Sequence, residues 1–149
     1  MAVIEIRVET ERPYKVLIGR DLLKGIGESL SPLHGPCSAA LVTDGTVDLL
    51  YGGTAAASLA RAGFRVARHA IPPGERSKTM DRLSLLLEFL AEEGFTRTDL
   101  IVALGGGVVG DLAGFAAAVY ERGIPYIQVP TTLLAAVDSS VGGKTGVNL

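Results

Sequence analysis

The stretch LIVALGGGVVGDLAGFAAAVY, residues 100–120, combines an apolar run, a glycine cluster and a helical pattern. The apolar run that opens it is continuous and short, which is typical of a strand buried on both faces of a sheet. Gly105, Gly107 and Gly110 then follow in the spacing G-x-G-x-x-G at the start of the helix. Such a turn favours a bound phosphate, because glycine lets backbone N–H groups approach an anion at the helix N-terminus. The motif alone is weak evidence, since glycine-rich turns are common.

The rest of the chain alternates between short apolar runs and helical periodicity from residue 39 onward. The apolar run predicts a strand at residues 100–104, and the helix after the glycine cluster is expected to reach about residue 121. Further strands are expected at residues 39–43, 65–71 and 126–129, and helices at residues 22–30, 47–62 and 77–93, with one more helix capped by Thr131. Two short strands at residues 3–8 and 14–18 come first. This order predicts one α/β domain with a Rossmann-like, mostly parallel sheet, helices on both faces and a preceding N-terminal strand pair.

The composition excludes several classes of protein. The net charge is −2 without a basic stripe, so a nucleic-acid partner is not expected. The most apolar stretch, residues 112–120, is far too short to span a membrane. A single cysteine, Cys37, is typical of a reducing compartment, and we expect a cytoplasmic protein. His34 and His69 lack metal-ligand spacing, so no metal site is expected within this chain.

Two features depart from an ordinary dinucleotide-binding domain. The glycine motif lies late in the chain rather than in the first strand–helix unit. The next strand ends in Pro130-Thr131-Thr132, where such domains usually carry an acidic residue for the ribose. Asp44, which follows an earlier strand, is the better candidate for the ribose diol. A turn aspartate before a glycine is the alternative interpretation of Asp44.

Asp111 lies near the start of the helix that follows the glycine cluster. A carboxylate there can stabilise the helix dipole, which is one sufficient explanation. An anion beside a phosphate site is otherwise unfavourable. The second interpretation is therefore a contact between Asp111 and a hydroxyl or an amide.

The segment VDSSVGGKTGVNL, residues 137–149, has the appearance of a nucleotide P-loop. That motif needs a glycine where this chain has Asp138, and a carboxylate would repel the phosphates. We therefore reject a P-loop. Gly142 and Gly143 fit a plain tight turn, but Lys144 together with Asp138 indicates a polar site.

Two blocks of sequence resemble the 3-dehydroquinate synthase family. The first is GGGVVGDLAGFAAAVYERGIPYIQVPTTLLAAVDSSVGGKTGVN, residues 105–148, and the second is PPGERSK, residues 72–78. Residues 1 to about 70 match the family only in pattern. Ala136 stands where many relatives have glutamine, with no evident chemical consequence.

The resemblance implies an NAD-dependent, phosphate-eliminating carbon–oxygen lyase of the shikimate pathway. Such enzymes convert 3-deoxy-arabino-heptulosonate 7-phosphate into 3-dehydroquinate and phosphate, and work as homodimers. A divalent metal, zinc or cobalt, polarises the hydroxyl that NAD oxidises. Its ligands lie in a helical C-terminal domain. Residues 1–149 are therefore expected to be a truncated or cleaved NAD-binding domain that is inactive alone.

The resemblance also implies roles for individual residues. The family's cofactor-binding positions match Glu75, Lys78, Gly107, Val108, Asp111, Thr131 and Thr132, to which we add Asp44, Gly106, Gly110 and Lys144. Catalytic roles are expected for three residues. Lys144 would contact the anionic substrate, Asp138 would accept hydrogen bonds from its hydroxyls, and Arg122 would reach the phosphate in a neighbouring subunit. A solvated arginine at a helix end is the alternative for Arg122.

Other functions remain open at this point. A relative could act on a different sugar phosphate, as inosose and valiolone synthases do, or be a more distant protein similar to glycerol dehydrogenase. A stand-alone nucleotide-binding module without catalysis is a third possibility.

Overall fold

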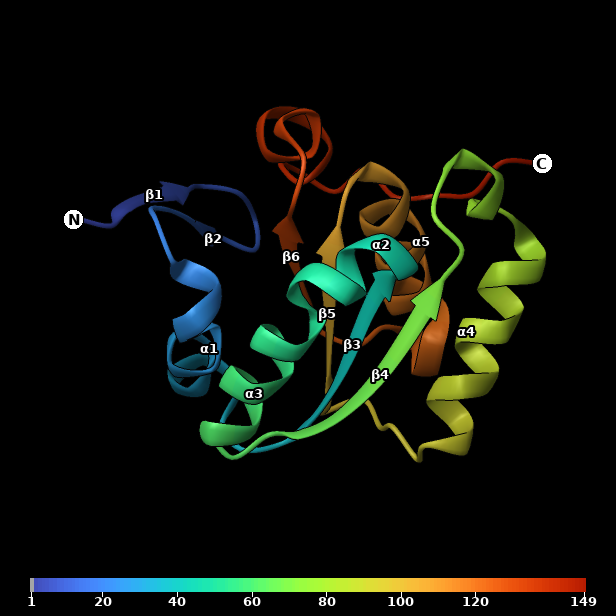
Figure 1. The fold of residues 1–149 in the computed structure, drawn as a ribbon, viewed down its shortest axis with the longest axis horizontal. Helices are drawn as coiled ribbons and strands as arrows, with labels where there is room; N and C mark the ends of the chain where they lie inside the picture. Colours follow the sequence, from blue (N-terminus) through green and yellow to red (C-terminus); the bar gives the residue numbers. More distant parts are fainter. Residues whose placement is uncertain (1) are drawn as a thin grey trace.

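A computed structural model describes residues 2–149 (Figure 1). A central parallel sheet has the strand order β4-β3-β5-β6, and an antiparallel pair, β1-β2, lies beside it. The strands are β1 (Ile4–Val8), β2 (Tyr14–Ile18), β3 (Ser38–Asp44), β4 (Arg65–Ile71), β5 (Leu100–Gly105) and β6 (Tyr126–Pro130). The predicted fold class, a mostly parallel α/β sheet after an N-terminal strand pair, is confirmed.

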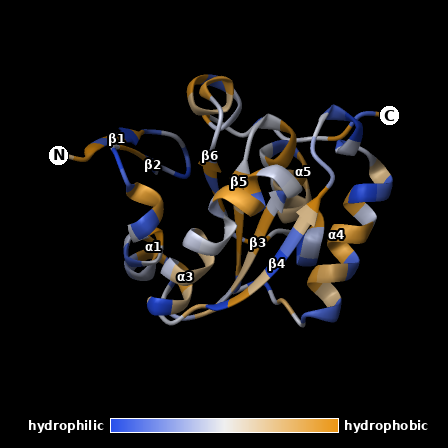
Figure 2. Cartoon of the chain, in the orientation of Figure 1, coloured by the Kyte–Doolittle hydropathy of each residue, from blue (hydrophilic) through white to orange (hydrophobic). Residues whose placement is uncertain are grey.

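Helices cover both faces of the parallel sheet. They are α1 (Ile26–His34), α2 (Gly45–Val47), α3 (Gly53–Arg61), α4 (Met80–Glu92) and α5 (Gly107–Val119). Alternate residues of β3 point to opposite faces, as the pleat of a strand requires. Ala39 and Leu41 pack with α1 and α3, whereas Ala40 and Val42 pack with α4 and α5. Figure 2 accordingly shows apolar colour along β3 and β5, and alternating polar and apolar bands on α4.

The structure corrects several predicted helix boundaries. The predicted helix at 22–30 begins as a 3-10 turn, Leu22–Gly25, and α1 then continues to His34. The helix at 47–62 is interrupted by a π-helical turn, Asp48–Gly52, in front of α3. The helix at 77–93 is shorter, since a 3-10 turn, Glu75–Ser77, precedes α4.

Two corrections concern the segments on either side of β6. The helix that was expected to reach about residue 121 ends at Val119, because Glu121 and Arg122 adopt left-handed φ values of 50° and 63°. After β6, the backbone N–H of Ala135 donates to the Thr132 hydroxyl at 3.1 Å. The cap is therefore Thr132 rather than Thr131. The element that follows is a short π-helical turn, Ala135–Ser139.

The described part of the chain, residues 2–149, contains no helix with both the length and the apolar character needed to cross a bilayer.

Candidate functional site

The candidate residues gather where the parallel strands end. β3 lies between β4 and β5, so the chain leaves β3 on one side and returns to it on the other. Ligands of open α/β sheets bind at such a switch point, in the crevice beyond the carboxyl ends of the strands. Asp44 ends β3 and Gly105 ends β5 on the two sides of this crevice. The glycine motif, although late in the chain, therefore occupies the position that the fold reserves for a ligand.

The N-terminus of α5 supplies free N–H groups at this position. The first helical hydrogen bond runs from the Gly110 N–H to the Gly106 carbonyl, at 3.1 Å. The N–H groups of Gly107, Val108 and Val109 precede that bond and have no acceptor within the helix. No side chain caps this terminus at Gly106. Three free donors and the positive end of the helix dipole make an anion-binding site.

The glycines of the motif exclude a side chain for different steric reasons. A Cβ at Gly105 would lie 2.6 Å from Val109, and one at Gly110 would lie 2.7 Å from the Gln128 side-chain oxygen. These two glycines serve the close packing of α5 on the sheet, and Gly110 also donates its N–H within the helix. A Cβ at Gly107 would instead lie 3.2 Å from the Ser139 hydroxyl, in a narrow gap above the helix terminus. Gly107 is thus the glycine that leaves room beside the free N–H groups.

An ion pair connects the loop after β4 with α5. The Lys78 ammonium lies 2.7 Å from the Asp111 carboxylate, and both side chains are about one-fifth exposed. The hydrogen bond to Asp111 raises the pKa of Lys78, although partial burial opposes the shift. Asp111 therefore contacts an ammonium group within this chain, a partner that neither interpretation of the sequence named. The pair fixes Lys78 beside the second turn of α5, one turn beyond the free N–H groups.

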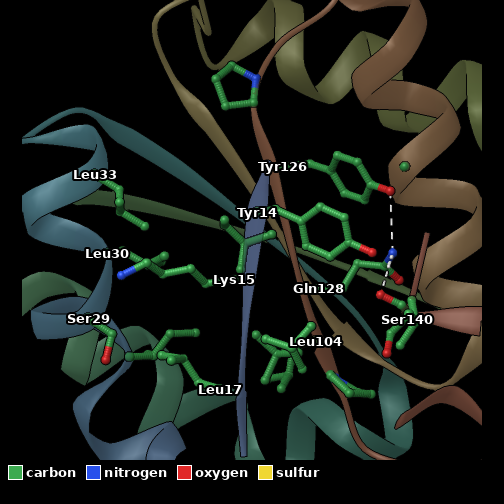
Figure 3. A pocket seen from close by; sticks show the side chains of 18 of the residues that line it. Tyr14, Lys15, Leu17, Ser29, Leu30, Leu33, Leu104, Tyr126, Gln128 and Ser140 are labelled. Atoms are coloured by element: carbon green, nitrogen blue, oxygen red, sulfur yellow. Dashed lines mark hydrogen bonds between the residues drawn. The ribbon is translucent and has the colours of Figure 1, made fainter. Parts of the chain in front are cut away.

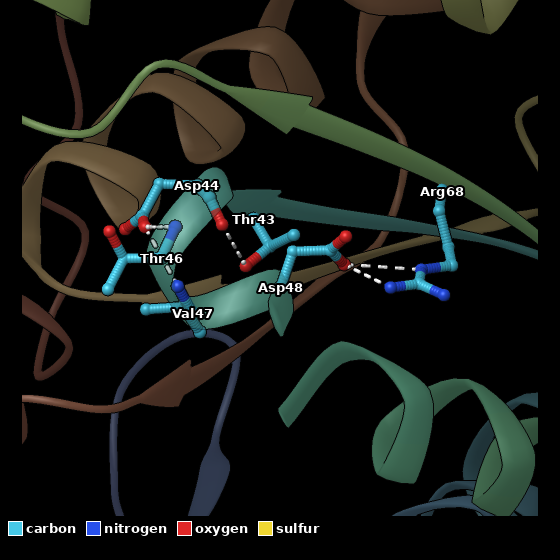
Figure 4. Close-up of polar contacts among 6 residues, drawn as sticks. All are labelled: Thr43, Asp44, Thr46, Val47, Asp48 and Arg68. Carbon is cyan, nitrogen blue, oxygen red and sulfur yellow. Dashed lines mark hydrogen bonds and ion pairs between the residues drawn. The ribbon is translucent and has the colours of Figure 1, made fainter. Parts of the chain in front are cut away.

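Asp44 acts as the N-cap of α2 (Figure 4). Its Oδ1 accepts hydrogen bonds from the N–H groups of Thr46 and Val47, at 2.9 and 3.0 Å. The next turn is held by an ion pair between Asp48 and Arg68 of β4. The turn interpretation of Asp44 is thus realised in the structure. Both capping bonds use Oδ1, so Oδ2 remains available to a ligand in the crevice.

The hydroxyl of Thr131 is the most unusual polar group of the site. Among residues 2–149, it is the buried side-chain oxygen or nitrogen atom that has no hydrogen-bond partner. A buried polar group without a partner costs roughly 1–3 kcal/mol, so proteins rarely keep one without a reason. Thr131 directly follows β6 on the same edge of the sheet as Asp44. A ligand that donates to this hydroxyl, or accepts from it, would remove the cost.

Lys144 and Asp138 form an exposed pair. The Lys144 ammonium donates to Asp138 Oδ1 at 3.3 Å, and the side chains are 76% and 58% exposed. The backbone between them turns at Gly142, whose φ is 92° and whose N–H donates to the Tyr14 hydroxyl of β2 at 3.1 Å. Both charged groups are therefore free to contact a solute, while the N-terminal strand pair holds the turn beside them.

A large open groove runs between the N-terminal strand pair and β6, and it extends to the turn that holds Lys144. Figure 3 shows Tyr14 and Tyr126 beside each other, with the amide of Gln128 between the Tyr126 hydroxyl and the Ser140 carbonyl. Arg122 lies farther along this groove, in the turn before β6. The structure therefore separates Arg122 from the candidate residues at the carboxyl ends of the strands.

Asn148 was not singled out by the sequence, yet it contacts two of the predicted cofactor residues. Its side-chain amide donates to Glu75 Oε1 at 2.9 Å, and its backbone N–H donates to the Lys78 carbonyl at 2.8 Å. Asn148 lies within the block that resembles the family, but nothing in the sequence indicates which distant residues it meets.

Within residues 2–149, no three histidine, cysteine, aspartate or glutamate side chains lie close enough together to hold a metal ion. The described residues therefore do not form a donor set for zinc or cobalt.

Comparison with known proteins places this geometry in a family. The family model for the N-terminal part of 3-dehydroquinate synthase matches residues 68–149. The 3-dehydroquinate synthase of Geobacter metallireducens is 54% identical over 138 residues, which cover 93% of this chain and 38% of that enzyme.

Two solved structures are similar over nearly the whole chain. One is 2-deoxy-scyllo-inosose synthase complexed with carbaglucose-6-phosphate, NAD+ and Co2+, with a TM-score of 0.88 and 32% identity over 99% of this chain and 40% of that one. The other is 2-epi-5-epi-valiolone synthase from Streptomyces hygroscopicus with NAD+ and Zn2+, with a TM-score of 0.82 and 33% identity over 97% and 39%. The chain spans about two-fifths of the length of these relatives. It belongs to the family of 3-dehydroquinate synthase N-terminal domains.

Proposed function

We propose that this chain is the NAD-binding portion of a 3-dehydroquinate synthase, the enzyme that converts 3-deoxy-arabino-heptulosonate 7-phosphate into 3-dehydroquinate and phosphate. The observation that carries the proposal is the pairing of a free helix terminus at Gly107 with an unpartnered buried hydroxyl at Thr131. Gly107 begins α5 at the switch point of the sheet, and Thr131 follows the neighbouring strand β6, with its N–H donating to the Gly105 carbonyl at 3.0 Å. A dinucleotide there would meet donors for its pyrophosphate and a hydrogen-bonding partner. The relatives solved with NAD+ support this ligand.

The residues present fit NAD. The N–H groups of Gly107 and Val108 would hold the pyrophosphate, and the free Oδ2 of Asp44 would accept from a ribose hydroxyl. Lys78, fixed by Asp111, would add a positive charge beside the anion. Thr131 would gain the partner that it lacks. When bound, NAD supplies a reversible acceptor for hydride.

The substrate would be held by the exposed pair at the end of the chain. The Lys144 ammonium is a compact point charge that suits a phosphate or carboxylate, and Asp138 can accept from sugar hydroxyls. Arg122, remote from these residues, would serve the phosphate in the neighbouring subunit of a homodimer. Because the described residues form no metal donor set, no step that needs zinc or cobalt is assigned to this chain.

A related sugar-phosphate cyclase is the second candidate. The solved inosose and valiolone synthases share the fold over nearly the whole chain. Identity supports the first candidate, because it is 54% to a 3-dehydroquinate synthase and 32–33% to those two cyclases. We therefore place the dehydroquinate reaction first.

Calorimetric titration of the chain with NAD tests the cofactor assignment. We expect saturable binding by the natural sequence and at least tenfold weaker binding by Gly107→Val, about 1.4 kcal/mol. The branched side chain would fill the gap beneath Ser139 and exclude the pyrophosphate from the helix terminus. Circular dichroism would check that the variant is folded. Equal affinities in two folded proteins would contradict the placement of the pyrophosphate at α5.

A further inference from the structure

The segment that follows Lys144 runs from α5 to the loop after β4. The Gly146 N–H donates to the Asp111 carbonyl at 3.3 Å. Farther along, Asn148 forms a parallel bridge with Thr79, in which its N–H donates to the Lys78 carbonyl at 2.8 Å. These backbone bonds attach the segment to the two partners of the partly buried ion pair, Lys78 and Asp111.

The Asn148 side chain adds a contact of a different kind. Its amide donates to Glu75 Oε1 at 2.9 Å, whereas the Lys78 ammonium reaches the same oxygen only at 3.9 Å. The Glu75 side chain is 66% exposed, and a carboxylate so exposed samples many rotamers unless it is held. The Asn148 amide is therefore the close contact that fixes the orientation of Glu75.

We propose that Asn148 is a positioning residue: its amide orients the Glu75 carboxylate, and its backbone joins the Lys144 segment to the Lys78 loop. The loop that faces the cofactor and the segment that faces the substrate then keep a fixed relation to each other. The proposal rests on the proposed function, since NAD is the ligand whose site Glu75 and Lys78 border.

The charges around Asn148 explain why an amide suits this position. The Asn148 amide contacts the carboxylate of Glu75. Beyond that carboxylate lies the Lys78 ammonium, which is paired with Asp111. A neutral amide donates to Glu75 without adding charge. An aspartate of similar size would place a second carboxylate in contact with Glu75, and two carboxylates that close cannot both ionise freely.

The first measurement is NAD affinity, by calorimetry, for the natural chain, Asn148→Ala, Asn148→Asp and Asn148→Asp/Glu75→Gln. We expect about fivefold weaker binding for Asn148→Ala, the equivalent of one net hydrogen bond. Asn148→Asp should bind more weakly still at pH 7.5 and regain affinity at pH 5, where one carboxylate can take up a proton. The double variant exchanges donor and acceptor, so it should bind better than Asn148→Asp at pH 7.5. Leu149→Ala is the matched control and should bind as the natural chain does.

The second measurement is amide hydrogen exchange at residues 146 and 148 without any ligand. In Asn148→Asp the protection factors of both amides should fall at pH 7.5 and recover at pH 5, because repulsion from Glu75 lifts the segment. If the natural chain does not bind NAD, the proposed function is overturned. The exchange result would then still support the attachment of residues 146 and 148 to α5 and the Lys78 loop. The positioning role would be overturned if, at pH 7.5, Asn148→Ala and Asn148→Asp both bind NAD as tightly as the natural chain and both keep its amide protection factors.

Discussion

Thr131 and Thr132 are adjacent residues of the same type, but their hydroxyls differ in whether they have a hydrogen-bond partner. The Thr132 hydroxyl accepts from the Ala135 N–H and begins the turn after β6. The Thr131 hydroxyl is buried without a partner. At the scale of single residues, local structure thus explains the hydroxyl of Thr132, whereas the hydroxyl of Thr131 has no partner within residues 2–149.

Valine substitutions at the two threonines should therefore change stability in opposite directions. Thr131→Val removes an unsatisfied hydroxyl and should stabilise the ligand-free chain by about 1 kcal/mol while it weakens NAD binding. Thr132→Val removes a cap and should destabilise the chain by about 1 kcal/mol. Urea unfolding with and without NAD would measure both effects. A Thr131→Val protein that is less stable than the natural chain would mean that the hydroxyl already has a partner.

At the scale of elements, α1 and α3 pack closely against each other at Gly27. A Cβ at Gly27 would collide with the Ser58 carbonyl oxygen and with Ala62. The Gly27 N–H donates to the Ser58 hydroxyl at 3.2 Å, and that hydroxyl donates to the Lys24 carbonyl at 2.9 Å. The absence of a side chain at Gly27 is what lets the two helices approach.

Alanine substitutions at two glycines separate this packing effect from helix propensity. Gly27→Ala should destabilise the chain by about 1–3 kcal/mol, because the added Cβ would collide with the rigid backbone of α3 at Ser58 and force α1 away from it. Gly53→Ala should instead stabilise it by roughly 0.5–1 kcal/mol, since that glycine lies in α3 with open space around it. Thermal melts of the two variants provide the check. A shift in the same direction for both would show that propensity, not contact, dominates.

At the scale of the whole molecule, one buried carboxylate joins the amino ends of the central strands. Asp99, just before β5, accepts from the N–H of Ser38 at the start of β3, at 2.8 Å. It also accepts from the N–H of Thr96 at 2.7 Å. Burial alone would raise the pKa of Asp99, but the hydrogen bonds from Thr96 and Ser38 outweigh it and hold the pKa below its usual value.

The contribution of Asp99 to stability should therefore depend on pH. Since the folded pKa lies below the unfolded value of about 3.9, its stabilisation is complete above that value and is lost as pH falls through the folded pKa. The free energy of unfolding of Asp99→Asn should be about 1–3 kcal/mol lower than that of the natural chain at pH 7, and this difference should shrink below about pH 4. Urea titrations at pH 7 and pH 3 would compare the proteins. A deficit that stays constant with pH would assign the effect to packing.

Much of the fold follows from local sequence because parallel strands buried on both faces are continuous apolar runs. The predicted strands at 39–43, 100–104 and 126–129 each match an observed strand to within a residue. The π-helical turn at Asp48–Gly52 was missed, since its stability depends on Arg68 of a strand that comes later in the chain.

The candidate site was predictable only in part, for a similar reason. The glycine motif marks a helix terminus that the strand order then places at the switch point of the sheet. The contacts of Lys78 with Asp111, and of Asn148 with Glu75, join residues from distant segments of the chain. No periodicity in the sequence encodes such pairs, because they depend on how the folded strands and helices bring these segments together. The ligand contacts of all these residues stay predictions.

The central position of β3 also has a consequence for the time that folding takes. Its two neighbours, β4 and β5, both come later in the chain, and β5 follows two intervening helical segments. Parallel pairing cannot start from a tight turn, so each partner must arrive by closure of a long loop. Until β5 arrives, β3, which is buried on both faces in the folded sheet, has one open edge. Refolding should therefore be slower than for a helical bundle of equal length, and aggregation will compete with it at high protein concentration.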